Sequence, residues 1–142
     1  MGRRETREAA VRFLFSRDFT ERENAELNEE TVRSFVDEFE EKAPEKVDAG
    51  YVLAVAKGVA GNLPRINELI YSHTDNWQPE RMARMDLAIL RVAVYEMLFE
   101  EDIPDSVSIN EAVELAKKYS HDDAGTFING ILGGIYRSLK NK

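Results

Sequence analysis

Few residues in this chain have the types and the spacing that chemistry requires. The two histidines, His73 and His121, are far apart in the sequence, and neither stands in a metal-binding helical pattern such as H-E-x-x-H. The chain has no cysteine, which excludes a disulfide framework, a thiolate metal site and a cysteine nucleophile. Gly130, Gly133 and Gly134 lie within a helical apolar pattern, so they predict close helix packing and not a phosphate-binding loop. The sequence therefore favours a protein that is not an enzyme and that has no metal site and no cofactor.

Three arginines stand close together at the N-terminus. Arg3, Arg4 and Arg7 fall in or just before the first turns of a helix predicted from about Arg4 to Arg17. Cations at a helix start oppose the helix macrodipole, at a cost of roughly a few tenths of a kcal/mol each. An anionic partner would explain these arginines, and so would an ordinary charged helix start. The residue types alone leave both interpretations open.

The charge of the chain is unevenly distributed. The formal net charge is −8 at pH 7, which argues against a general nucleic-acid coat protein. Residues 1–20 nevertheless hold five arginines against three acidic residues, whereas residues 21–48 hold four basic residues against eleven acidic ones. Residues 106–142 hold five basic residues against four acidic ones. We expect a polyanion to approach the N-terminal arm or the C-terminal third.

Two aromatic and two acidic side chains are further candidates for binding. Phe15 and Phe127 lie near the boundary between apolar and polar helix faces, where a ring either packs in the core or stacks on an unpaired base. Asp86 and Asp123 stand at predicted helix starts, and helix capping is the stronger interpretation for both. Acidic side chains can also accept hydrogen bonds from base amino groups.

Apolar residues recur with the helical period almost throughout the chain, and no strand-like alternation competes with this pattern. Residues 21–26 are expected to form an exposed acidic loop, and Asn28 and Ser108 are expected to cap helices. A kink or a break is expected between Gly61 and Pro64. Helices are expected over about residues 4–17, 28–43, 44–70, 77–84, 86–100, 108–119 and 122–139.

These elements predict an all-α fold with about seven helices in two packed helical bundles. We expect a single domain over residues 1–142, with an N-terminal bundle over about residues 1–74 and a C-terminal bundle over about residues 75–142. No apolar run approaches the length of a membrane span, and no signal peptide follows the first arginines. We therefore expect a cytoplasmic protein with no membrane contact.

Four segments of the chain carry a recognisable pattern. They are Arg3-Arg4-x-x-Arg7-Glu8-Ala9-Ala10, then Trp77 and Arg81 followed by Asp86-x-Ala88-Ile89-Leu90-Arg91, then Ile103-Pro104-x-x-Val107-x-Ile109-Asn110-Glu111-Ala112, and last Phe127-Ile128-Asn129-Gly130-Ile131-Leu132. In this order and at this spacing, they resemble the NusB family of bacterial transcription antitermination factors over nearly the whole chain. Each segment alone is a weak signal, but the four together are specific.

The resemblance implies the NusB-like fold and a role in transcription. Members of the family pair with NusE, a ribosomal protein of the small subunit. The pair binds single-stranded boxA RNA of nascent ribosomal RNA transcripts and supports the antitermination complex on RNA polymerase. The resemblance implies NusE against the C-terminal half, and it leaves a homodimer open. The residues that match the family's RNA-binding positions are Arg3, Arg4, Arg7, Asp86, Asp123 and Phe127.

Two alternatives stand beside an RNA-binding antitermination factor. A protein-interaction module of the same fold, with little RNA binding of its own, would suit the acidic net charge. An enzyme would suit the NusB-like domain that precedes the catalytic part of some ribosomal RNA cytosine methyltransferases. We expect no such enzyme, because little of the 142-residue chain remains beyond this fold to hold a methyl donor, and no cysteine is present.

Overall fold

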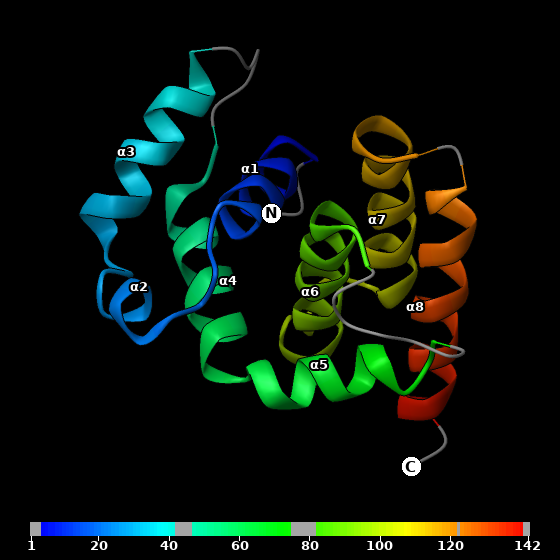
Figure 1. The fold of residues 1–142 in the computed structure, drawn as a ribbon. Helices are drawn as coiled ribbons and strands as arrows, with labels where there is room; N and C mark the ends of the chain where they lie inside the picture. The colour runs from blue at the N-terminus through cyan, green and yellow to red at the C-terminus, as the bar shows by residue number, and fades with distance from the viewer. Residues whose placement is uncertain (1–3, 42–46, 75–81, 122, 141–142) are drawn as a thin grey trace. The chain divides into compact units, whose positions relative to one another are not determined.

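The computed structural model describes residues 4–41, 47–74, 82–121 and 123–140, and over these residues it contains helices and no strand (Figure 1). The predicted all-α fold is therefore confirmed, and the expected number of about seven helices is close to the eight observed in these ranges. None of these helices is long and apolar enough to cross a membrane. The helices are α1 (Arg4–Phe15), α2 (Glu21–Ala25), α3 (Glu29–Glu40), α4 (Ala49–Gly61), α5 (Leu63–Tyr71), α6 (Arg84–Phe99), α7 (Asp105–Tyr119) and α8 (Ala124–Lys140).

The chain divides into two compact units, Met1–Gly61 and Asn62–Lys142. The sequence analysis placed the boundary between the two bundles later, near residue 74. The structure has a break between α4 and α5, since α4 ends at Gly61 and α5 begins at Leu63 with Pro64 in its first turn. The interruption expected at this point is confirmed. Helix α5 then packs on α6 and α8, which makes it part of the second unit.

The first unit is built around α1 and α4, which pack on each other, with α3 against both. Phe13 of α1 is buried and meets Phe35 of α3 edge-on, with ring centroids 5.2 Å apart. Offset and edge-to-face aromatic pairs of this kind add stability beyond the area they bury. The hydroxyl of Thr6 accepts a hydrogen bond of 3.2 Å from the backbone N–H of Asp48. This bond ties the start of α4 to α1.

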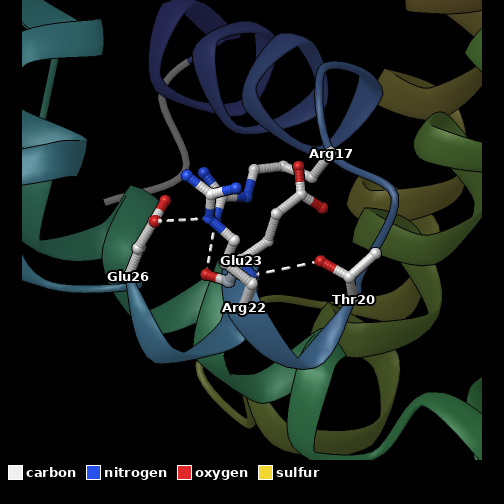
Figure 2. Close-up of polar contacts among 5 residues, drawn as sticks. All are labelled: Arg17, Thr20, Arg22, Glu23 and Glu26. Carbon is white, nitrogen blue, oxygen red and sulfur yellow. Dashed lines mark hydrogen bonds and ion pairs between the residues drawn. The ribbon is translucent and has the colours of Figure 1, made fainter.

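The acidic segment after α1 is not the loop that the sequence predicted. Residues Glu21–Ala25 form the short helix α2, whose start is capped by Thr20, while the Glu23 side chain reaches back to the backbone before the helix. The Thr20 hydroxyl accepts from the Glu23 N–H at 3.2 Å, and the Glu23 carboxylate accepts from the Asp18 N–H at 2.7 Å. Figure 2 shows Thr20 at the start of this turn and Arg17, whose guanidinium donates to the Glu23 carbonyl. The T-x-x-E spacing of a capping box was the signal for this helix.

Of the N-caps predicted at Asn28 and Ser108, the first is confirmed and the second is wrong. Asn28 caps α3 as expected, with its side chain accepting from the Thr31 N–H at 2.9 Å. Ser108 does not cap a helix, because α7 begins earlier, at Asp105. Pro104 occupies the N-cap position of α7, where a proline is compatible with a helix start. The expected short helix beginning at Trp77, and Pro44 in the first turn of another, lie outside the described residues.

The second unit packs α6, α7 and α8 against one another, with α5 on α6 and α8. Most of α6 is buried, in keeping with a sequence that is apolar nearly all round. A Cβ added at Gly134 would lie 2.8 Å from Cδ2 of His73, so the close packing expected of the α8 glycines is confirmed there. It is wrong for Gly130, whose Cβ would meet nothing within 4 Å.

Candidate nucleic-acid interface

A short connection between α7 and α8 holds one of the predicted binding residues, Asp123, and another, Phe127, lies in the first turn of α8. We call the described residues of this connection, Ser120, His121 and Asp123, the α7–α8 turn. Ser120 ends α7 in an extended conformation, with φ −124° and ψ −165°. The His121 carbonyl accepts from the Ala124 N–H at 3.0 Å, and the Asp123 carbonyl accepts from the Phe127 N–H at 3.1 Å. The first turn of α8 is thus built directly on the backbone of the α7–α8 turn.

The α7–α8 turn presents an acidic group to solvent, and the first turn of α8 presents an aromatic ring. Asp123 is exposed, and Phe127 has 38% of its surface exposed although the next residue, Ile128, is fully buried. The sequence left Phe127 open between core packing and stacking on a base, and the structure places the ring at the surface. An exposed aromatic ring beside hydrogen-bond acceptors is the arrangement that binds unpaired bases in single-stranded RNA.

Asp86 lies beneath the same turn. It is only 2% exposed, and one carboxylate oxygen, Oδ1, accepts a hydrogen bond of 2.6 Å from the Ser120 hydroxyl. Its other oxygen, Oδ2, lies 3.4 Å from Nε2 of His121. A buried carboxylate needs such partners, because losing its hydration without replacement is costly. The sequence reasoning missed Ser120, since no local pattern pairs it with a residue 34 positions away.

The predicted capping role of Asp86 is wrong. Helix α6 begins at Arg84, two residues before Asp86, and its N-cap position is held by Ala83 without a side-chain hydrogen bond. Asp86 therefore lies within the first turn of α6 and points towards the end of α7. The side chain of His121 is 59% exposed. Its contact with Asp86 was not foreseen.

The N-terminal arginines differ from one another in exposure. Arg3 lies outside the described residues, and Arg4, the first residue of α1, is exposed. Arg7 is only 2% exposed, so the structure does not present its guanidinium at the surface. Further along α1, Arg12 and Phe15 are exposed, and the guanidinium of Arg12 lies 5.6 Å from the ring centre of Phe39. The surface of α1 thus carries two cations and an aromatic ring.

Two polar side chains elsewhere in the second unit, Arg91 and Tyr95, make hydrogen bonds within the protein. Arg91 is half-buried and its Nε donates to Asn67 at 3.2 Å, and burial lowers the pKa of its guanidinium. Burial, reinforced by a hydrogen bond to Glu100, raises the pKa of Tyr95 to about 12, so this phenol stays protonated at neutral pH. Among the described residues, no His, Cys, Asp and Glu side chains group closely enough to hold a metal ion.

Comparisons with known proteins agree with one another over almost the whole chain. The sequence profile of the NusB family matches residues 4–137. The transcription antitermination protein NusB of Clostridium botulinum (strain Kyoto / Type A2) is 46% identical over 144 residues, covering 94% of this chain and 98% of that protein. The protein of the same name from Acetivibrio thermocellus is 39% identical over 137 residues, covering 96% and 90%.

Solved structures show the same architecture. A crystal structure of T. maritima NusB matches with a TM-score of 0.70 and 33% identity, covering 94% of this chain and 89% of that one. A crystal structure of the antitermination factors NusB and NusE in complex with dsRNA matches with a TM-score of 0.71 and 23% identity, covering 96% and 97%. At that identity, the second likeness bears on the fold alone.

Proposed function

Because the chain belongs to the NusB family, we propose that it is a transcription antitermination factor that binds single-stranded boxA RNA together with NusE. The observation that carries this proposal is the 46% identity to an antitermination protein NusB over 94% of the chain. In this role the pair binds nascent ribosomal RNA transcripts and supports assembly of the antitermination complex on RNA polymerase. The chain itself has no catalytic role, and it works in the cytoplasm as a single domain over residues 1–142.

Each of the two units contributes side chains to RNA binding. In the second unit, the exposed ring of Phe127 stacks on a base, and the exposed carboxylate of Asp123 accepts a hydrogen bond from a base amino group. In the first unit, Arg3 and Arg4 contact phosphates, which raises affinity without reading sequence. The burial of Arg7 and Asp86 supports an indirect contribution from these two residues.

The net charge of −8 makes NusE the natural partner for this task. A chain of this acidity repels most RNA, so it binds RNA weakly alone. The same charge attracts a basic ribosomal protein, and electrostatic complementarity increases the rate and the specificity of such encounters. RNA then binds to a surface formed by both proteins, to which NusE adds positive charge.

The test is the binding of a fluorescent boxA-like RNA with and without NusE. We expect affinity to rise when NusE is added and to fall about 5- to 100-fold in Phe127→Ala, as the loss of one base stack predicts. Tyr136→Ala is the matched control, because Tyr136 is also on α8 and also 38% exposed, and it should leave RNA affinity unchanged. Equal losses in both variants would remove the evidence for stacking by Phe127.

A protein-interaction module with the same fold is the second candidate, and the acidic net charge favours it. Such a module would bind NusE but would add nothing to the affinity of NusE for RNA. Measuring the RNA affinity of NusE alone, beside that of the pair, separates the two functions. An RNA affinity identical for NusE and for the pair would establish the module and refute the antitermination role through RNA.

A further inference from the structure

Asp86 is shielded from solvent by the very residues that it contacts. Its 2% exposure leaves almost no carboxylate surface for an RNA base or backbone. Both of its oxygens face the α7–α8 turn, with the Ser120 hydroxyl at 2.6 Å and the His121 imidazole at 3.4 Å. A direct contact between this carboxylate and RNA would require the turn to move away first.

We propose that Asp86 is a positioning residue that holds the α7–α8 turn in the conformation that presents Asp123 and Phe127 to RNA. This assignment rests on the proposed function, in which the exposed ring and carboxylate of these two residues meet the RNA. It replaces the direct RNA contact that the family resemblance implied for Asp86. The group that transmits the effect is Ser120, with His121 covering the carboxylate from the solvent side.

The bond to Ser120 is well suited to fix this turn. A hydroxyl that donates to a carboxylate forms a short, charge-assisted hydrogen bond, and 2.6 Å lies in that range. Ser120 is the residue at which α7 ends, so the bond decides where the helix stops and where the extended backbone begins. The carbonyls of His121 and Asp123, which follow directly, accept the first N–H groups of α8. A displaced Ser120 would therefore displace the start of α8.

The chain contains a matched control for this arrangement. Glu96, also on α6 and only 1% exposed, accepts a hydrogen bond of 2.7 Å from the hydroxyl of Ser108 on α7. The chemistry equals that of the Asp86–Ser120 pair, and the same two helices are joined. Ser108, however, lies near the beginning of α7, whereas Ser120 lies at its end. Loss of the Ser108 bond should cost stability without affecting the α7–α8 turn.

The first measurement is amide hydrogen exchange of the free protein, which needs no RNA. In Ser120→Ala we expect the N–H groups of Ala124 and Phe127 to exchange about 10-fold faster relative to the rest of α8, since a charge-assisted bond is lost. Asp86→Asn should have the same effect on these two N–H groups if the variant folds. If Asp86→Asn does not fold, Ser120→Ala still tests the proposal. Ser108→Ala should leave this ratio unchanged.

The second measurement is the affinity of the pair with NusE for boxA-like RNA. Ser120→Ala should weaken binding about 3- to 10-fold, and Ser120→Thr, which keeps the hydroxyl, should restore it. The loss should be smaller in a Phe127→Ala background, because the displaced turn then misplaces only the carboxylate of Asp123. Ser108→Ala should bind RNA as the wild type does.

Each contrary outcome has a distinct meaning. Unchanged exchange at Ala124 and Phe127 would overturn the assignment, as would a faster exchange that leaves RNA affinity intact. An Asp86→Asn variant that loses RNA binding while Ser120→Ala keeps it would show a direct contact instead. A wild-type protein that binds no RNA even with NusE would refute the proposed function, and the exchange data would then still decide whether Asp86 holds the turn.

Discussion

The imidazole of His73 occupies the space that a side chain at Gly134 would need. A Cβ at Gly134 would lie 2.8 Å from Cδ2 of His73, closer than real contacts of this kind. The ring has little freedom to retreat, because its Nδ1 lies 2.8 Å from the Leu69 carbonyl and 3.1 Å from the Ser72 hydroxyl. The last helix can approach the end of α5 only because position 134 has no side chain.

This relationship predicts opposite effects for two glycine substitutions in α8. Gly134→Ala should lower the free energy of unfolding by about 1–3 kcal/mol, since the new methyl group overpacks against His73. Gly130→Ala should raise it by roughly 0.5–1 kcal/mol, because its Cβ meets nothing and alanine favours the helix. Urea unfolding measures both. In a His73→Ala background, Gly134→Ala should become stabilising, and a persistent loss there would point to another cause.

Removing the first two arginines should change the salt dependence of RNA binding. If Arg3 and Arg4 contact phosphates, replacing both with Ala should lower the slope of log affinity against log salt concentration by about 1.4. The measurement is RNA binding by the pair with NusE over a series of salt concentrations. The control with the same change in charge replaces Arg22 and Arg33, which are exposed on α2 and α3. An equal slope change in the control would mean that net charge alone is responsible.

Arg7 should behave as a residue of the folded core. Its side chain is 2% exposed, so Arg7→Ala removes both buried aliphatic packing and a buried charge. We expect the free energy of unfolding to fall by roughly 1–3 kcal/mol, whereas Arg4→Ala at an exposed position should change it by less than about 0.5 kcal/mol. Chemical denaturation of both variants checks this. Loss of RNA binding at full stability would instead make Arg7 a surface contact.

Glu23 should make the first unit sensitive to acid. The hydrogen bond from the Asp18 N–H lowers the pKa of the Glu23 carboxyl below its ordinary value of 4.5. A depressed pKa in the folded state means that the stabilisation is present above the pKa of the unfolded chain and is lost as the pH falls through the folded value. The wild type should therefore lose stability below about pH 4.5 more steeply than Glu23→Gln.

Acid unfolding curves of the two proteins measure this difference. Glu26→Gln provides the comparison, because it removes an exposed contact of 3.4 Å with Arg22. It leaves the N-terminal cap of α2, formed by Thr20, in place. Figure 2 shows both carboxylates, with Glu23 in α2 and Glu26 at its C-cap position. Parallel curves for the wild type and Glu23→Gln would show that the cap does not control acid stability.

The sequence predicted some of the features that are decided locally, although it missed the equally local cap of α2. Asn28 caps its helix because the bond from Thr31 needs only a residue three positions away. Ser108 carries the same type of signal and does not cap, because α7 begins earlier and Ser108 lies inside it, where its hydroxyl donates to the buried carboxylate of Glu96. The same difference explains Asp86, which a local pattern assigns to a cap and whose true partner lies 34 residues later.

The sequence also could not predict which of the candidate side chains are buried and which are exposed. Arg7 is buried, although arginine side chains are mostly exposed in proteins. Phe127 is 38% exposed, although phenylalanine is among the residues most often buried. Helical periodicity defines a stripe but not its exact limits, and both residues lie at the edge of one. The candidate site could therefore be predicted by residue identity, but not by which of its members reach the surface.

The two serine–carboxylate bonds, Ser108 to Glu96 and Ser120 to Asp86, together fix the axial register of α7 on α6. The serines are 12 positions apart, about 18 Å along a helix, so one bond restrains each end. A slide of α7 by a single turn, or a rotation about its axis, would break both bonds at once. The two bonds therefore restrain opposite ends of α7 separately, and when one of them is lost the other still holds its own end in register on α6.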